Sequence, residues 1–366
     1  MNVLYFLFLL PLVAYSVQIV SWYIIWIRTD DFIPEERSVK DISVIIPFKD
    51  ESRHLPALIH SLNRQSHQNW ELVLINDHSE DDSLCLLNQL LQQFSHPYKL
   101  INATGHGKKT ALQEGVNAVL NPVVVTTDAD CTFHPDWLAT LSSYYQLHQP
   151  DLLIGPVGIR NSKGLLSRFQ AIDFAALQIS GGAAALAKQP IMCNGANLMC
   201  RKDLYQSTNL QTEIASGDDM FLLEWLKEQG KEIHYIKSNK ALVETESITS
   251  LKDFIQQRAR WAAKAPKYKD KQIIRTGLTI ALSNFIIVLC LVFSIWLPDF
   301  IKVFLFLLTV KSLCDFILLK AGSRTFRISI SLLEVLIWQL FYPFYSLSVL
   351  VYPLFFKLKW KSRAIG

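Results

Sequence analysis

The sequence predicts an α/β domain with a largely parallel sheet, placed between apolar segments that are long enough to cross a membrane. Two observations predict this arrangement. Half of the 366 residues are apolar and only 19% are charged, and the apolar excess is concentrated towards the two ends of the chain. Between these ends, short β-branched runs alternate with stretches of helical spacing, which is typical of α/β domains.

The first element is an apolar segment that spans residues 1–27 and contains no charged side chain. At a rise of about 1.5 Å per residue, a helix of this length crosses a bilayer. A cleavable signal peptide would need a basic start and a cleavage site of small residues, and neither is evident. We therefore expect an N-terminal transmembrane anchor over residues 1–27.

The central region then alternates strands and helices. Strands are expected at 42–46, 70–75, 98–101 and 123–127, and helices at 54–64, 84–94 and 109–120. Pro47 is expected to stop the first strand, because proline cannot donate to a strand ladder. Three strands end in polar residues, namely Lys49-Asp50-Glu51, Asn76-Asp77 and Asp128-Ala129-Asp130. Ligands of such sheets bind beyond the carboxyl ends of the strands, so we expect these side chains on one rim.

The following segment is less regular. A strand is expected at 152–157 and a helix at 165–187, with a potential break at Gly181-Gly182. A further helix is expected at 218–229, where two acids in the first turn suit the helix dipole. The apolar spacing of residues 251–261 predicts another helix, which leads straight into the C-terminal apolar region.

The C-terminal region has three apolar stretches, at 276–297, 300–319 and 328–356. The last contains Pro343 and Pro353 and is long for one helix, so it is either a tilted, kinked span or a re-entrant pair. We expect a transmembrane region over 276–356 with about three spans.

Basic residues near the apolar segments predict the orientation. Arg28, Arg37 and Lys40 follow the first segment, and five basic residues lie between 264 and 275. We therefore expect an integral, multi-pass membrane protein with a cytoplasmic domain over 40–270, in the inner membrane if the host is bacterial. The tail with Lys357 and Lys361 also favours the cytoplasmic side, which three full spans would not allow, so the number of spans is left open. The net charge of +4 is largely explained by these residues, and we expect no nucleic-acid partner.

Asp128 and Asp130 are the first candidate site. On an extended segment, side chains two positions apart point the same way. Two such carboxylates repel each other, and a bound Mg²⁺ or Mn²⁺ would relieve the repulsion. The alternative is a solvated turn that merely ends a strand. Asp77 is suited to accept hydrogen bonds from a base or a ribose, whereas residues 79–82 are better explained as a helix-capping turn.

Two further groups carry chemistry. Asp218 and Asp219 are adjacent, so one can cap a helix while the other faces a pocket as a general base. Gln257, Arg260 and Trp261 lie within about one helical turn, where an arginine can grip a diphosphate and a tryptophan offers a flat wall for a sugar or lipid. The alternative for this second group is an interfacial helix. In the apolar region, Lys311 and Asp315 are expected to face each other on a helix.

The order of these motifs resembles the family 2 glycosyltransferases from about Ser43 to Trp261. "SVIIPFKDE" looks like the opening strand of that family, "VLINDHSEDDS" like its nucleotide-binding strand end, and "GKKTAL" like its Gly-Lys segment. "TTDADC" matches the D-x-D motif, "SGDDMFL" resembles the second acidic motif, and residues 257–261 match Q-x-x-R-W. The chain departs from the usual D-D-G-S, with Asn76 for the first Asp and His78 for the Gly, and Asp218 stands for a Glu.

The resemblance implies a GT-A fold, which is a Rossmann-like mixed sheet that binds a nucleotide-diphosphate sugar. It implies that the nucleotide sugar is held by Pro47, Glu51, Asp77, Lys108 and Asp128. It further implies that Asp130 binds the metal and that Asp219 is the catalytic base. Gln257, Arg260 and Trp261 would close over the diphosphate and shape the entrance for the acceptor.

Within the family, one anchor before the domain and about three spans after it look like ceramide glucosyltransferase and its bacterial relatives. This implies an inverting, Mg²⁺- or Mn²⁺-dependent transfer of sugar to a lipid or lipid-linked acceptor at the cytoplasmic face. One alternative is a processive polysaccharide synthase of the cellulose, chitin or hyaluronan type. Another is an inactive membrane scaffold that retains the fold. Polyprenyl-phosphate sugar transferases rank third among the active types, because they generally lack Q-x-x-R-W.

Overall fold

The structure is a computed structural model that describes residues 2–34, 41–160, 163–208, 217–360 and 363–365. The chain forms two compact units, one made of 1–28, 161–191 and 247–366, and the other of 29–160 and 192–246. Two segments of the expected 40–270 domain, 161–191 and 247–270, therefore belong to the unit that holds the apolar helices. Arg37, Lys40 and Lys361, on which the expected orientation partly rests, lie outside the described residues.

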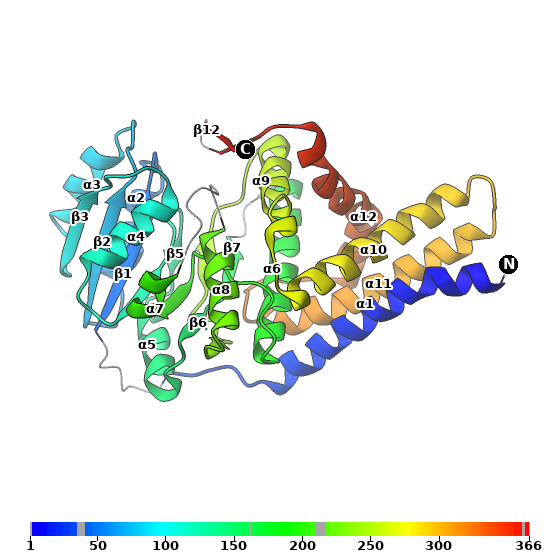
Figure 1. Ribbon diagram of the computed structural model, residues 1–366, viewed down its shortest axis with the longest axis horizontal. Helices are drawn as coiled ribbons and strands as arrows, with labels where there is room; N and C mark the ends of the chain where they lie inside the picture. The colour runs from blue at the N-terminus through cyan, green and yellow to red at the C-terminus, as the bar shows by residue number, and fades with distance from the viewer. Residues whose placement is uncertain (1, 35–40, 161–162, 209–216, 361–362, 366) are drawn as a thin grey trace. The chain divides into compact units, whose positions relative to one another are not determined.

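The unit of residues 29–160 and 192–246 is built on a seven-stranded sheet in the order β3-β2-β1-β4-β8-β6-β9 (Figure 1). Its strands are β1 (Ile42–Phe48), β2 (Trp70–Asn76), β3 (Tyr98–Asn102), β4 (Val123–Thr126), β6 (Leu152–Ile154), β8 (Leu198–Arg201) and β9 (Ile233–Tyr235). The strands β1 to β4 run parallel, while β8 runs antiparallel to both of its neighbours. The expected α/β class with a mixed sheet is confirmed.

Helices and a small second sheet complete this unit. The helices are α2 (Leu55–Asn63), α3 (Ser83–Leu91), α4 (Lys108–Ala118), α5 (Trp137–His148), α7 (Lys202–Ser207) and α8 (Asp218–Glu228). The second sheet has the order β5-β10-β7, with β5 (Thr132–Phe133), β7 (Val157–Ile159) and β10 (Val243–Thr245). The expected strand over 152–157 is therefore wrong as a single element. It divides at Gly155-Pro156, and the two halves join different sheets.

The first strand continues through Pro47, so the expectation that this proline stops it is wrong. Pro47 is aligned with Ile75 of β2. The other neighbour, β4, pairs with β1 only as far as Ile45. The proline thus lies where β1 has one strand neighbour instead of two, and its missing N–H removes no ladder bond on the open side.

The polar strand ends gather on one rim, as expected. Phe48 of β1 is aligned with Asn76 of β2, and Ile45 is aligned with Thr126 of β4, so the three parallel strands end at the same edge of the sheet. α4 packs closely on this part of the sheet because of Gly115. A Cβ atom there would lie 2.6 Å from Cδ1 of Ile75.

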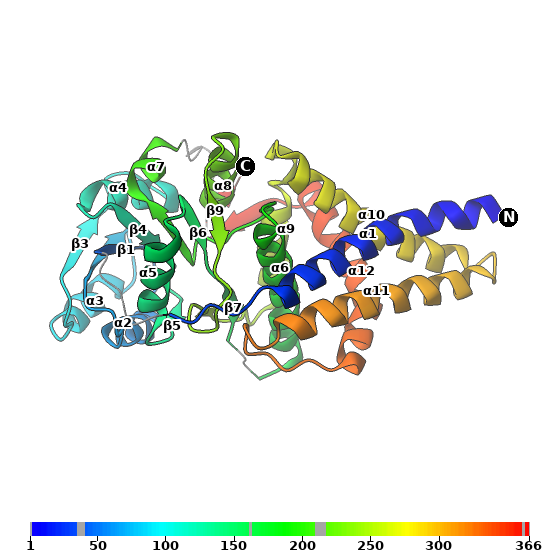
Figure 2. The same cartoon turned by 90° about the horizontal axis from the view of Figure 1, so that it is seen from below.

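The other unit consists of helices. They are α1 (Asn2–Arg28), α6 (Leu165–Leu186), α9 (Leu251–Ala262), α10 (Lys271–Phe293), α11 (Phe300–Gly322) and α12 (Leu332–Phe355), and they are accompanied by the short hairpin β11 (Leu358–Trp360) and β12 (Arg363–Ile365). Figures 1 and 2 both show α1, α10 and α11 side by side. α6 runs unbroken through Gly181-Gly182, and α12 is one helix that contains both prolines, rather than a re-entrant pair.

Three helical segments are long and apolar enough to cross a membrane, namely Phe8–Arg28, Lys271–Phe293 and Leu332–Phe355. By length and composition the chain is therefore that of a membrane protein. α11 is as long as α10, but it carries Lys302, Lys311, Asp315 and Lys320 and is not among these segments. The number of spans and their direction remain predictions.

A buried polar network around Lys311 ties α1, α11 and α12 together. Lys311 is 1% exposed, and its Nζ atom lies 2.7 Å from Oδ2 of Asp315 and 3.2 Å from Oε1 of Gln339. The hydroxyl of Tyr15 donates to the other oxygen of Asp315, and Nζ lies 4.8 Å from the ring centre of Tyr342. The expected pairing of Lys311 with Asp315 is confirmed, and it extends to two neighbouring helices.

The first prediction concerns this network. Lys311→Met leaves the Asp315 carboxylate without its buried cation, and we expect it to destabilise the helical unit by about 3–5 kcal/mol. The measurement is thermal unfolding of the purified protein in detergent. Lys311→Met combined with Asp315→Leu should recover most of the loss, because neither charge then remains. Lys302→Met, which removes an exposed pair with Asp299, is the control and should change little. Equal melting temperatures for Lys311→Met and the wild type would contradict the prediction.

Candidate active site

The candidate site is built on an ion pair at the carboxyl edge of the sheet. Nζ of Lys108 lies 2.6 Å from Oδ1 of Asp128, and both side chains are partly exposed. Lys108 is the first residue of α4, and Asp128 follows the end of β4. Gly107, which precedes the helix, has φ = 96°, a conformation that favours glycine. This glycine allows the chain to turn from the rim into α4 with the lysine beside the acid.

Asp128 and Asp130 do not lie on an extended segment, so this part of the expectation is wrong. β4 ends at Thr126, and Ala129 and Asp130 form a turn in which the Cys131 amide donates to the Asp128 carbonyl at 3.3 Å. The two carboxylates nevertheless interact. The charge of Asp130 adds to the rise that burial causes in the pKa of Asp128. The hydroxyl of Thr245, in β10, donates to Oδ2 of Asp130 at 2.9 Å and fixes that carboxylate.

Asp218 and Asp219 join the same group through Gly195. The amide of Gly195 donates to Oδ2 of Asp219 at 3.2 Å. A Cβ atom at Gly195 would lie 3.3 Å from Oδ2 of Asp218 and 3.6 Å from Nζ of Lys108, so only a small residue fits between the two acids and the lysine. Gly217, with φ = 90°, occupies the N-cap position of α8, so Asp218 is not the cap. Asp218 is buried, whereas Asp219 is half-buried.

The charges of this group shift each other's pKa values. Burial raises the pKa of Asp128, the Lys108 ammonium opposes that shift, and the Asp130 and Asp218 carboxylates add to it. Burial alone would lower the pKa of Lys108, but the carboxylates of Asp128, Asp218 and Asp219 together raise it well above its usual value. Lys108 is therefore held charged, and it partly neutralises a cluster of acids.

The residues expected to hold the nucleoside lie at the ends of β1 and β2. Pro47 is near the end of β1, and Oε2 of Glu51 lies 2.6 Å from Nδ1 of His54. Asp77 is 2% exposed, its amide donates to the Phe48 carbonyl, and its Oδ1 accepts from the Gly107 amide at 2.9 Å. Lys108 directly follows Gly107. The loop whose amide binds Asp77 therefore also carries the lysine that pairs with Asp128. Asp77 also belongs to a group with His78 and His106 that is able to hold a metal ion.

Gln257, Arg260 and Trp261 belong to the helical unit, where they lie on α9. All three side chains are partly buried. Burial lowers the pKa of the Arg260 guanidinium to about 10. The structure thus shows these three residues on one helix, in the unit that does not contain the four acids.

The sequence analysis missed the arginine between them, Arg258, and its partner Asp173. Nη2 of Arg258 lies 2.9 Å from Oδ2 of Asp173 in α6, and both side chains are 4% exposed. The guanidinium carbon lies 4.4 Å from the ring centre of Trp261, and the Tyr345 hydroxyl of α12 donates to Asp173 at 3.4 Å. Burial raises the pKa of Asp173, and Arg258 opposes the rise. The available signal was a lone acid in an otherwise apolar stretch of α6.

The second prediction tests the electrostatics of the acid group. Lys108→Met removes the cation, and we expect a loss of about 1 kcal/mol in the free energy of unfolding at pH 7–8, since both partners are partly exposed. The loss should shrink as the pH falls. The pKa of Asp128 is raised in the folded state, so folding favours the protonated carboxyl. The resulting loss of folding free energy is absent at low pH and grows as pH rises through the folded pKa. In the wild type, the contribution of Lys108 is present below the unfolded lysine pKa of about 10.4 and is lost only as pH rises through its higher folded pKa.

The measurement is thermal unfolding between pH 5 and 8 in a chelating buffer. The difference in stability between mutant and wild type is compared at each pH. Lys99→Met is the control, because Lys99 pairs with Glu71 at 3.4 Å, away from the acid group. A loss that does not vary with pH in Lys108→Met would contradict the prediction.

Residues 43–207 match the family described as Glycosyl transferase family 2. An undecaprenyl-phosphate 4-deoxy-4-formamido-L-arabinose transferase of Pectobacterium carotovorum is 34% identical over 113 residues, which is 29% of this chain and 34% of the relative. An uncharacterized glycosyltransferase of Nostoc sp. is 31% identical over 121 residues, which is 31% of this chain and 38% of the relative. The chain thus spans about a third of the length of the curated relatives it matches.

One solved structure is similar over almost the whole chain. It is a mannosyltransferase from Pyrobaculum calidifontis in complex with GDP-Man and Mn²⁺, with a TM-score of 0.62 and 16% identity, covering 95% of this chain and 98% of that one. This likeness shows the fold, and the expected GT-A fold is confirmed. The expected resemblance to the family 2 glycosyltransferases is likewise confirmed, and residues 43–207, which contain β1 to β4 and the Lys108–Asp128 pair, are the part of the chain that carries it.

Proposed function

We propose that this protein is a membrane-bound, inverting glycosyltransferase that moves a sugar from a nucleotide-diphosphate donor to a lipid or lipid-linked acceptor at the cytoplasmic face. One observation carries the proposal. Lys108, Asp218 and Asp219 lie around Gly195, and Lys108 pairs with Asp128 at the carboxyl edge of the sheet, where ligands of α/β folds bind. The GT-A fold and the family match of residues 43–207 support the reaction type.

The donor is assigned to the unit that holds the sheet. Pro47, Glu51, Asp77 and Asp128 are proposed to hold the nucleoside, because they lie at or beyond the ends of three adjacent parallel strands. Lys108 is proposed to contact the donor as a cation. Its raised pKa keeps it charged at neutral pH, which suits an anionic ligand. The Pyrobaculum mannosyltransferase was solved with GDP-Man, which supports a nucleotide sugar as the class of donor.

The metal is assigned to Asp130, with Mg²⁺ or Mn²⁺ as the ion. The Asp128 and Asp130 carboxylates supply only oxygen donors, and these are the ligands that hard divalent cations prefer. Burial raises the pKa of Asp128 and the Asp130 carboxylate adds to the rise, so a bound cation would stabilise the charged form of Asp128. When bound, the ion would act as a Lewis acid on the leaving diphosphate. The Mn²⁺ in the Pyrobaculum structure supports this choice.

The general base is assigned to Asp219. Its Oδ2 accepts from the Gly195 amide and its Oδ1 accepts from the Met220 amide at 2.8 Å, so the carboxylate is fixed in orientation. A carboxylate held in this way can take the proton from an acceptor hydroxyl as that oxygen attacks the anomeric carbon. A single displacement of this kind inverts the configuration at the anomeric carbon. Positioning of the two substrates contributes about 7–11 kcal/mol in favourable cases.

Gln257, Arg260 and Trp261 are proposed to bind the diphosphate and the acceptor. Arg260 offers the planar fork of donors that matches phosphate oxygens. Trp261 already packs on the Arg258 guanidinium, which fixes the plane of its ring. The proposal for these three residues rests on the Q-x-x-R-W match and on their common place on α9.

The lipid nature of the acceptor is supported by two observations. Three helical segments are apolar and long enough to cross a membrane. The relative from Pectobacterium is named as a transferase to undecaprenyl phosphate, although it matches only 29% of this chain. A processive polysaccharide synthase remains the second candidate, because such enzymes share Q-x-x-R-W. The two are separated by the product, which is one sugar per acceptor for the first and a ladder for the second.

The third prediction tests the base. We expect Asp219→Asn to lower sugar transfer by about 10²–10⁴-fold, because an amide cannot accept the proton, while donor binding changes little. Transfer is read by mass spectrometry of lipid products after incubation with a panel of nucleotide sugars, native lipid extract and Mg²⁺ or Mn²⁺. Donor binding is read by calorimetry on the same preparations.

Asp203→Asn is the matched control, since Asp203 is an exposed acid on α7 that pairs with Arg201. It should leave transfer unchanged. Wild-type turnover in Asp219→Asn would remove Asp219 from its role. Absence of transfer and of donor binding in the wild type with every nucleotide sugar would favour the inactive scaffold.

A further inference from the structure

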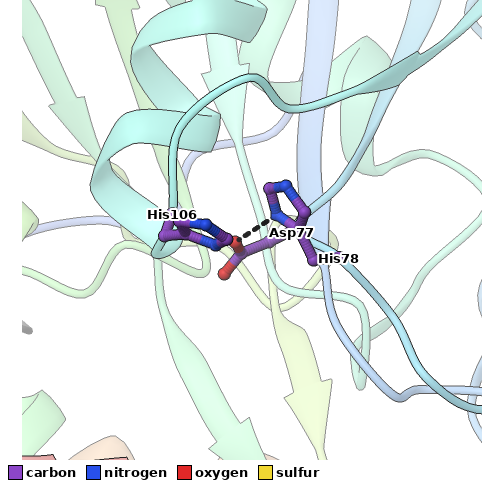
Figure 3. A group of neighbouring side chains, drawn as sticks. All are labelled: Asp77, His78 and His106. Carbon is purple, nitrogen blue, oxygen red and sulfur yellow. Dashed lines mark hydrogen bonds and ion pairs between the residues drawn. The ribbon is translucent and has the colours of Figure 1, made fainter.

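A second group of metal-ligand side chains lies beside the acid group, at the end of β2. Asp77, His78 and His106 each offer one ligand atom, and these atoms all lie within 4.8 Å of one another. Figure 3 shows the three side chains close together, with the Asp77 carboxylate next to His78, and the centres of the two imidazole rings lie 4.1 Å apart. His78 follows β2 directly, and His106 comes from the loop before α4. None of the proposed catalytic steps uses either histidine.

The loop that carries His106 is fixed on both sides. Before it, the Glu114 carboxylate of α4 accepts from the amides of Thr104 and Gly105 at 2.9 and 3.0 Å. After it, the Gly107 amide donates to Oδ1 of Asp77 at 2.9 Å. The backbone of the loop that carries His106 is therefore held by hydrogen bonds to two carboxylates, those of Glu114 and Asp77. Such outer hydrogen bonds orient metal ligands.

The carboxylate of Asp77 has an unused oxygen. Oδ2 is buried and has no hydrogen-bond partner among the described residues, while Oδ1 accepts from Gly107 and lies 3.4 Å from Nδ1 of His78. A buried carboxylate oxygen without a partner is destabilising, because it has lost its hydrogen bonds to water. A cation bound at this oxygen would remove that cost.

The backbone at His78 has an unusual conformation. His78 has φ = 57°, in the left-handed region that a glycine adopts without strain. The family motif usually has glycine at this position. The chain therefore holds an imidazole beside Asp77 in a conformation that favours a residue without a side chain, and strain of this kind is typical of functional positions.

The chemistry of the ligands selects the class of metal. Imidazole nitrogens are borderline donors, and two of them with one carboxylate form a ligand set that suits Zn²⁺, whereas the carboxylates at 128 and 130, which are hard donors, suit Mg²⁺ or Mn²⁺. Zinc binds nitrogen at about 2.0–2.1 Å, which places ligand atoms of a tetrahedral site about 3.4 Å apart. The ligand atoms now lie within 4.8 Å of one another, so the rings of His106, which is exposed, and His78, which is half-exposed, would have to turn towards the ion.

We propose that Asp77, His78 and His106 form a Zn²⁺ site that is separate from the acid group and keeps one coordination position open. Because Asp77 is also assigned to the donor nucleoside, the ion and the donor would compete for its carboxylate. That consequence rests on the proposed function, whereas binding of the ion does not.

The fourth prediction tests binding alone. The full-length protein, free of any histidine tag and stripped with a chelator, is titrated with Zn²⁺ by calorimetry and with Co²⁺ by visible absorption, which reports tetrahedral coordination. We expect one bound ion with tetrahedral Co²⁺ bands. His78→Gly and His106→Ala should each weaken binding by about tenfold or more, because each removes a ligand. His78→Gly also relaxes the backbone at φ = 57°, so it should fold at least as stably as the wild type.

Two controls complete the experiment. His60→Ala removes an exposed histidine of α2 and should leave Zn²⁺ binding unchanged. Asp130→Asn should also leave it unchanged, because Asp130 belongs to the acid group. Equal Zn²⁺ affinity in His78→Gly, His106→Ala and the wild type would overturn the proposal, as would loss of Zn²⁺ binding in Asp130→Asn alone. Failure of sugar transfer with every donor would refute the proposed function without affecting either binding result.

Discussion

Repulsion among carboxylates at one edge of the sheet is the constraint on which the rest of this structure depends. Asp128, Asp130, Asp218 and Asp219 come from two separate parts of the chain, and Lys108 is the cation that the structure places among them. The lysine offsets part of the repulsion, and the amide of Gly195 and the hydroxyl of Thr245 hold two of the acids in place. A bound divalent cation would offset the surplus of negative charge that remains.

The elements around this edge follow from that constraint. A lysine reaches Asp128 because Gly107 turns the chain into α4, and α4 sits close to the sheet because Gly115 has no side chain. The mixed order of the sheet brings β8, and with it Gly195, next to β4. The strand order thus brings the charged groups to the same edge, and the glycines allow them to approach closely.

Much of this was predictable from the sequence, for identifiable reasons. Short β-branched runs predicted β1 to β4 to within one or two residues, and parallel pairing then required their polar ends to share a rim. What failed depended on contacts between distant residues. Pro47 is tolerated because β4 is short, and the turn at Ala129-Asp130 is not encoded in the run that precedes it. The Arg258–Asp173 pair joins two helices with no spacing rule to connect them.

The Arg258–Asp173 pair connects the helix of the Q-x-x-R-W motif to an apolar helix. It fastens α9, the helix of Gln257, Arg260 and Trp261, to α6 and, through Tyr345, to the apolar helix α12. The segment that bears the Q-x-x-R-W motif is therefore mechanically continuous with a helix that is suited to lie in lipid. Bilayer thickness and the choice of detergent should consequently influence how Gln257, Arg260 and Trp261 are positioned.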